Sequence, residues 1–447
     1  MMARHWLPLQ LRSGLAHRLI GATIGSSGVW ATGTLVTFGI GILLARPLGP
    51  EGYGVYGTAL AIVSLLSVVA TLGFPLVATR ELAAAKAQGD AAALAGHRRW
   101  FPRLVLATSL ATAAALMLGL ALLGPLVAPR VREVLVWAAL LLPGMAACTL
   151  ASAMLRGLGD VVMGQTLEVL VRPLLFAGGL ATLYLLAVRL TPERAMIAQC
   201  LSTAVAAALG FWWLARRWSD DVRNAVPQRS LRRWKASAWP LAVMDSFRAI
   251  EGNYGVLLVS ALSTTTEAGL LRVALASLAL CIAPISLQNL IVAPYLSEAA
   301  AQGRMQQVQR IASGSALFMA AAVGAVTLFF ALAGQWLLPT VFGAGFAPAY
   351  QPLIILCLGQ FVTAAAGPGV TLLAMLHAEK AAARTFALPT LLAAAVVVVV
   401  APVAGATGAA AVMLVSSIVR AAMVRQAVWK HAGIRISVLS FFLRARA

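Results

Sequence analysis

The sequence predicts an all-α integral membrane protein with 12 transmembrane helices, arranged as two six-helix lobes related by a parallel (same-orientation) repeat around a central cavity. The first observation is composition: 61% of the 447 residues are hydrophobic and 11% are charged, against roughly 25% charged residues in a typical soluble domain. A soluble core cannot bury that much apolar surface. The second is that the apolar runs continue for about 20 residues, whereas the strands of a barrel would alternate over about ten.

Each predicted helix is an apolar segment long enough to cross a bilayer. In chain order these segments are 24–45, 53–77, 101–124, 134–155, 161–186, 195–214, 238–262, 268–293, 312–335, 351–376, 386–403 and 408–429. Residues 1–20 are basic and are broken by Pro8 and Gly14, so they lack the apolar core and cleavage site of a signal peptide. We expect the first segment to act as its own insertion signal.

The net charge of +20 is distributed in a way that predicts orientation. Lysines and arginines gather in the loops that lie on the same side as both termini, and the positive-inside rule makes that side cytoplasmic. The arginines expected on the outer side are Arg46, Arg130, Arg132, Arg189 and Arg194. The basic loops suit anionic membrane lipids. They form no soluble basic face, so no nucleic-acid partner is expected.

An internal repeat predicts how the spans are divided. A shift of about 217 residues places Arg12-Ser13 on Arg229-Ser230 and brings the loop at Glu51 close to Glu267. Six spans per copy is an even number, so both copies insert the same way up, about an axis along the membrane normal. The predicted domains are an N-terminal lobe (1–215), a basic cytoplasmic linker (216–235), a C-terminal lobe (236–429) and a basic cytoplasmic tail (430–447).

Cysteine placement argues against disulfides and metal sites. Cys148, Cys200, Cys281 and Cys357 each fall inside an apolar segment, and the sequence contains no CxxC motif or Cys/His cluster. The cysteines are interpreted as small core residues. Since no nucleotide-binding motif is present either, we predict no metal, no cofactor and no enzymatic activity.

Several short motifs carry a family resemblance. The most specific is segment 43–56, LLARPLGPEGYGVY, and weaker ones are Gly73-Phe74-Pro75, Thr79-Arg80-Glu81, 155–160 and Val341-Phe342-Gly343. Together they resemble the polysaccharide (O-antigen, Wzx-type) flippases of the multidrug/oligosaccharidyl-lipid/polysaccharide (MOP) exporter superfamily, over essentially the whole chain. Considered alone, the glycines and Pro50 of the first motif indicate a tight reversal between antiparallel helices, and a phosphate cradle is a less specific alternative.

The resemblance implies a flippase that moves undecaprenyl-pyrophosphate-linked oligosaccharide, or a similar lipid-linked glycan, by alternating access. Such a protein would lie in the bacterial cytoplasmic membrane and serve lipopolysaccharide or other surface polysaccharide synthesis. Its partners would be the lipid-linked oligosaccharide and, in a synthesis complex, a glycan polymerase or glycosyltransferases.

The predicted span 238–262 holds three charged residues, Asp245, Arg248 and Glu251. A charge at membrane depth costs several kcal/mol unless it pairs or faces water. A spacing of three places these side chains on an arc about 120° wide on one helix. We therefore expect this arc to face a hydrated cavity inside the bundle.

Three further charged residues are candidates for the same cavity. Arg172 lies near the middle of span 161–186 with Glu168 one turn away, and Arg272 lies near the outer end of span 268–293, within reach of the interface. The arginines of the candidate site, Arg172, Arg248 and Arg272, would bind the pyrophosphate or acidic sugars, because a guanidinium donates two parallel hydrogen bonds to such groups.

The acids, Glu168, Asp245 and Glu251, are candidates for protonation and coupling. The alternative is that each acid only neutralises the arginine on its own helix.

Two other functions stay open. One is export of drugs or small molecules; the other is a scaffold role, without transport, in a glycan-synthesis complex. Multidrug antiporters of the superfamily often carry a carboxylate in the first span, and this chain has none between residues 24 and 45. The lipid II flippases typically have two further spans, for which the chain has no room.

Overall fold

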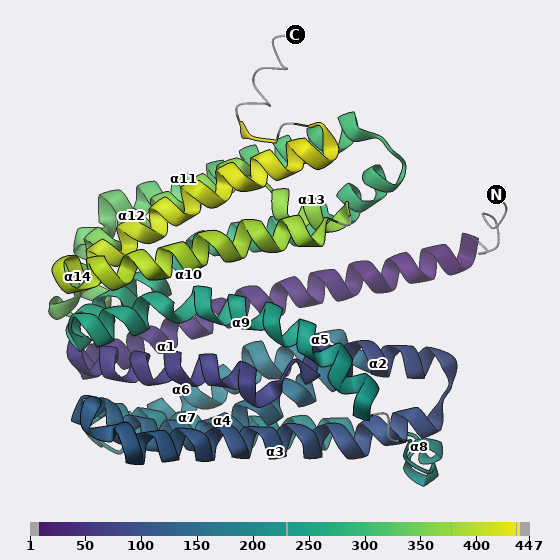
Figure 1. Ribbon diagram of the computed structural model, residues 1–447, viewed down its shortest axis with the longest axis horizontal. Helices are drawn as coiled ribbons and strands as arrows, with labels where there is room; N and C mark the ends of the chain where they lie inside the picture. The colour runs from purple at the N-terminus through teal and green to yellow at the C-terminus, as the bar shows by residue number, and fades with distance from the viewer. Residues whose placement is uncertain (1–8, 229–230, 377, 435, 439–447) are drawn as a thin grey trace.

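The computed structural model describes residues 9–228, 231–376, 378–434 and 436–438. Within these residues every regular element is helical, and two bundles lie one above the other in Figure 1. Residues 1–8, part of the predicted linker (229–230) and the end of the predicted tail (439–447) lie outside the described residues.

The first half of the chain forms α1 (Leu9–Thr71), α2 (Phe74–Gln88), α3 (Ala91–Leu123), the short helix η1 (Gly124–Leu126), α4 (Pro129–Gly157), α5 (Val161–Thr166), the π-helix η2 (Leu167–Val171), α6 (Arg172–Leu185), α7 (Pro192–Ala215) and α8 (Asp220–Asn224). The second half forms α9 (Leu231–Leu262), α10 (Thr265–Ala301), α11 (Met305–Phe342), the short helix η3 (Ala344–Ala349), α12 (Tyr350–Ala366), α13 (Gly369–Met375) and α14 (Glu379–Ala432).

In the part of the chain that the structure describes, 9 helices are long and apolar enough to cross a membrane. The all-α membrane class is thus confirmed. The number is below twelve partly because α1 and α14 each merge two predicted spans. Each contains a glycine with non-helical torsion angles, Gly49 (φ 66°, ψ 177°) and Gly405 (φ 51°, ψ −135°), conformations that glycine adopts without a Cβ clash. The other reason is that α9, with its three charges, is not among the nine.

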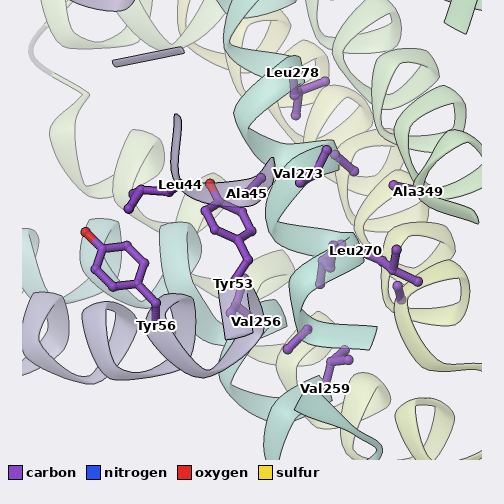
Figure 2. Packing of buried hydrophobic residues seen from close by; sticks show 14 of the residues in the cluster. Leu44, Ala45, Tyr53, Tyr56, Val256, Val259, Leu270, Val273, Leu278 and Ala349 are labelled. Atoms are coloured by element: carbon purple, nitrogen blue, oxygen red, sulfur yellow. The ribbon is translucent and has the colours of Figure 1, made fainter. Parts of the chain in front are cut away.

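Apart from the start of α9, which packs with the first half, hydrophobic packing joins the two halves at one end only. The largest cluster includes the residues around the turns at Gly49 and Gly405 and draws side chains from both halves. Figure 2 shows part of it, with Tyr53 of α1 next to Leu270 and Val273 of α10. Towards the other end the packing splits into one cluster built mainly from α2, α3, α4 and α7 and a second built from α10, α11, α13 and α14. The halves therefore share a core near these turns and have separate cores away from them.

Two glycines make the shared end possible. A Cβ on Gly54 of α1 would lie 1.7 Å from the carbonyl oxygen of Thr265, and one on Gly269 of α10 would lie 1.9 Å from that of Pro50. The two backbones are therefore in direct contact, an approach that only small residues permit. Gly54 serves this helix contact, and the reversal itself takes place at Gly49.

Helix α9 is packed against both halves. Trp234, near its start, lies against the rings of His97 and Phe101 of α3, and a Cβ on Gly73 would lie 2.5 Å from the carbonyl oxygen of Ala238. Its far end contributes to the shared cluster with α10 and α14. The segment predicted as a linker thus contains α8 and the beginning of a helix that is anchored in the first half. The division into lobes at residue 236 stays a prediction.

Candidate functional site

The charged residues of α9 do not simply neutralise one another within that helix. The carboxylate of Glu251 forms an ion pair and hydrogen bond with the guanidinium of Arg420 on α14. Arg420 also lies over the ring of Phe386, 5.6 Å from its centroid. The alternative in which Glu251 only neutralises the arginine on its own helix is therefore wrong in this structure, because an arginine from another helix pairs with this acid.

Arg248 is left open by that pairing. Its side chain is exposed although it lies in the middle of α9, and within the described residues it has no ion pair shorter than 4.0 Å. Its charge still acts on the carboxylate of Asp245, one turn earlier. Gly252 continues the same face, because positions i, i+4 and i+7 align on a helix, and an added Cβ there would meet no atom within 4 Å. The face that holds Arg248 is thus open to a ligand.

Glu168 lies in the π-helix η2, inside the first half. Its Oε2 accepts a hydrogen bond from the Ser152 hydroxyl at 3.2 Å and lies 3.5 Å from Nη1 of Arg156 on α4. The ion-pair partner of this acid is again an arginine from another helix, where the sequence suggested Arg172.

The π-helix has a local cause. Proline at position 173 has no N–H to donate to the carbonyl of Val169, and its ring would clash with that carbonyl in a regular α-helix, so regular α-helical geometry is disfavoured here. The freed carbonyl of Val169 faces α1, where a Cβ on Gly33 would lie 2.4 Å from its oxygen. The widened turn therefore carries Glu168 and also packs against the first arm of α1, the part of this helix before Gly49.

Arg172 and Arg272 lie on opposite halves of the chain, on α6 and α10. The charges of both arginines act on the hydroxyl of Tyr56, which donates a hydrogen bond to Oε1 of Gln199. Arg272 extends across α1: a Cβ on Gly57 would lie 3.3 Å from its Cδ. The side chain thus lies between the halves, in the region of their shared core, and its reach to the membrane interface stays a prediction.

The six predicted residues therefore form three groups. Glu168 pairs with Arg156; Glu251 pairs with Arg420, on the helix that also carries Asp245 and Arg248; and the charges of Arg172 and Arg272, from opposite halves, both act on Tyr56. Residues that the sequence interpretation missed are Arg156, Arg420, Tyr56 and Gln199. For Arg420 a signal was present, since a lone arginine inside an apolar segment needs a partner.

Within the described residues, no group of three or more His, Cys, Asp or Glu side chains is placed to hold a metal ion. The chemistry available to these groups is the binding of anions by guanidinium groups, and proton or ion exchange at the paired carboxylates.

Comparison with known proteins identifies one matching family model and solved structures with a similar fold. A family model described as "Polysaccharide biosynthesis protein" matches residues 23–300. No curated protein matches the sequence. Among solved structures, the chain is similar to a multidrug resistance transporter of the MATE family, in the MOP superfamily, in its inward-facing conformation: the TM-score is 0.71 at 14% identity, over 92% of this chain and 98% of that one.

The same superfamily supplies two further similar structures. The lipid II flippase MurJ in an inward closed conformation has a TM-score of 0.71 at 10% identity, over 91% of this chain and 87% of that one. An outward-facing conformation of a MATE family multidrug transporter gives a TM-score of 0.57 at 14% identity, over 93% and 96% of the two chains. These similarities show the fold.

Proposed function

Because the chain belongs to the polysaccharide biosynthesis protein family and has the fold of the MOP superfamily transporters, we propose that it is a flippase for undecaprenyl-pyrophosphate-linked oligosaccharide or a similar lipid-linked glycan. It is a multi-pass membrane transporter and not an enzyme. The proposed location is the bacterial cytoplasmic membrane, with both termini in the cytoplasm, and the proposed role is surface polysaccharide synthesis, such as that of lipopolysaccharide.

The observation that carries this proposal is the open guanidinium of Arg248. A cation in the middle of an apolar helix is expensive unless it meets water or an anion, and here Glu251, the acid three positions further along the helix, is taken by Arg420. A pyrophosphate offers oxygens to which the planar fork of an arginine can donate two hydrogen bonds at once. Arg248 is therefore suited to be the first cation that the anionic part of the cargo meets.

The proposed mechanism is alternating access between two lobes of six spans each, residues 1–215 and 236–429, with twelve spans in all. Separate cores at one end and a shared core at the other support a shape that is open on the side of the basic loops. The higher TM-score to the inward-facing than to the outward-facing MATE structure supports the same state. The glycan head would pass between the lobes while the lipid tail stays in the bilayer.

The second pair of arginines would act later on this path. The charges of Arg172 and Arg272 both act on Tyr56, a residue of the shared core, so an anion that leaves Arg248 would next meet these two cations. The proposed coupling groups are Glu168, Asp245 and Glu251. Neutralising Glu168 would release Arg156 to the cargo, and neutralising Glu251 would release Arg420. Proposed partners are anionic lipids at the basic loops, and a glycan polymerase or glycosyltransferases.

A leaflet assay tests the proposal. Cells that lack the protein should accumulate lipid-linked glycan on the cytoplasmic leaflet, and the wild-type chain should restore export. We expect Arg248→Gln to lower export at least tenfold and Arg248→Lys to restore part of it. Arg310→Gln is the matched control, since Arg310 is an exposed arginine at the start of α11. Full export by a folded Arg248→Gln variant would contradict the assigned role.

Export of a small molecule is the second candidate, because the multidrug transporter matches the fold as well as MurJ does. The first arm of α1 contains no carboxylate in its described residues, 9–48, which disfavours a drug/proton antiporter of the type that uses one there. If deletion leaves glycan distribution unchanged and creates drug sensitivity, the chain is an exporter. If it changes neither, and only glycan synthesis falls, the scaffold role is correct.

A further inference from the structure

A polar cavity lies in the second half of the chain, apart from the α9 charges. Its volume is about 830 Å³, within the range of roughly 300–1,000 Å³ that is usual for small-molecule sites. Its walls come from the turn between α9 and α10, the first turns of α10, the end of α11, the start of α12 and the turn at Gly405 of α14. These segments lie at the end where the two halves share their core, opposite the basic loops.

The polar groups of this cavity are available for binding. The side-chain amides of Gln335 and Gln351 and the hydroxyls of Ser263 and Thr407 line the cavity, and within the described part of the chain none of them makes a hydrogen bond. Amides can both donate and accept, and hydroxyls do the same. Such a set matches the hydroxyl groups of a sugar, which also donate and accept.

One wall is held rigidly. Oε2 of Glu267 accepts a hydrogen bond from the backbone N–H of Ala406 at 2.8 Å, and the Thr264 hydroxyl accepts one from the N–H of Glu267 at 3.1 Å. A Cβ on Gly405 would lie 2.4 Å from the Glu267 carboxylate, so the glycine allows the turn and the carboxylate to touch. The carboxylate is thus fixed at the cavity wall before any ligand arrives.

Apolar surface lies beside these polar groups. The ring of Tyr350 packs on α11, where a Cβ on Gly334 would lie 3.0 Å from it, and its hydroxyl donates to the carbonyl of Ala331 at 2.9 Å. Pro348, Pro352 and Pro402 add further apolar surface to the lining. A sugar presents C–H faces as well as hydroxyl groups, and rings and prolines provide flat surfaces for those faces.

The charge of the cavity excludes an anion. Among the described residues, Glu267 is the one charged residue in its lining, and no arginine, lysine or histidine contributes. A phosphate or an acidic sugar would meet a carboxylate without a compensating cation. The arginine groups suit an anionic ligand, whereas this cavity suits a ligand without negative charge.

We propose that this cavity is a carbohydrate-binding site for neutral sugar units. Its assignment to the outer face, where it would hold the head of a glycan that has crossed, rests on the proposed flippase function. Sugar binding itself follows from the cavity alone.

Saturation-transfer NMR on the full-length chain in nanodiscs tests the site. The probes are glucose, galactose, mannose and N-acetylglucosamine, with glucose 6-phosphate as the anionic comparison. We expect transfer to the ring protons of at least one neutral sugar and none to glucose 6-phosphate. The double variant Gln335→Ala/Gln351→Ala should lose at least 80% of the transfer. The matched control is Gln306→Ala/Gln307→Ala, two exposed glutamines at the opposite end of α11, which should keep it.

A second variant keeps the result decisive if the double variant fails to fold. Ala404 is an exposed residue of the lining, so Ala404→Trp should fill the cavity without disturbing the core and should abolish transfer. Absence of transfer from all four neutral sugars, or equal transfer in the cavity variants, would overturn the site. Failure of flipping with intact, cavity-dependent sugar binding would overturn the proposed function and leave the site standing.

Discussion

Glu251 of α9 is paired with Arg420 of α14, 169 positions away, and not with Arg248, which lies three positions away on its own helix. The pair joins two helices of the second half and leaves the guanidinium of Arg248 exposed. Arg420 thus has a positioning role: it holds Glu251 away from Arg248. Removal of Arg420 should therefore affect cargo binding through Arg248, although Arg420 itself need not touch the cargo.

The first prediction is a rescue experiment on this pair. Arg420→Gln should lower glycan export about tenfold, because Glu251 then becomes available to neutralise Arg248. Glu251→Gln combined with Arg420→Gln should recover most of the export, since the competing acid is also gone. The leaflet assay on the two single variants and the double variant measures the coupling. If the double variant is as poor as Arg420→Gln alone, Arg420 acts on the cargo directly and the positioning role is excluded.

The second prediction concerns the contact of α1 with α10. Gly54→Leu places a side chain where a carbonyl oxygen already lies, so the two helices must separate, and overpacking of this kind costs roughly 1–3 kcal/mol or more. Spin labels at Glu51 and Ala344, in a cysteine-free chain, should report a longer distance in the variant. Gly119→Leu is the control, because an added Cβ at Gly119 of α3 meets nothing within 4 Å. An unchanged distance in both variants would show that Gly54 does not hold the halves together.

Composition and hydropathy were sufficient to predict the all-α membrane class, because the bilayer imposes length and polarity on each segment independently. The tight reversal between the first two spans was predictable from its glycines and prolines for the same local reason. The direct contact of Gly54 with Thr265 was not, since a glycine for a turn and a glycine for a helix crossing look alike in one sequence.

The candidate site shows more clearly that a single sequence does not reveal contacts between helices. The sequence identified Asp245, Arg248 and Glu251 as an expensive group that needs polar surroundings. The only pairing that it offered, as an alternative, was neutralisation along one helix, because spacings of three and four are the contacts that a single sequence displays. Arg420 and Arg156 reach Glu251 and Glu168 from other helices, and such contacts depend on how the helices pack. The π-helix at Glu168 likewise follows from Pro173 only once its packing against Gly33 is known.

The third prediction tests that π-helix. Pro173→Ala supplies the missing N–H, so the segment should return to regular α-helical hydrogen bonding and turn Glu168 away from Ser152 and Arg156. We expect the melting temperature to stay level or rise, because a proline inside a helix costs about 3 kcal/mol, while glycan export falls severalfold. Pro143→Ala in α4 is the control: Pro143 lies inside a helix without a π-segment. Wild-type export by Pro173→Ala would show that the widened turn has no functional role.

The fourth prediction compares two tryptophans of α9. Trp234 is 3% exposed and lies 5.0 Å, centroid to centroid, from Phe101, so Trp234→Ala removes the side chain that anchors the start of α9 in the first half. Substitutions of this type destabilise by roughly 3–5 kcal/mol, and we expect a clear fall in the melting temperature. Trp239, five residues further along, is 68% exposed, so Trp239→Ala should leave the melting temperature nearly unchanged. Thermal unfolding of both variants in the same detergent measures the difference. Because α9 also carries Arg248, loosening its anchor should also reduce glycan export by the Trp234→Ala molecules that remain folded. If the variant melts earlier but exports normally per folded molecule, the anchor has a purely structural role.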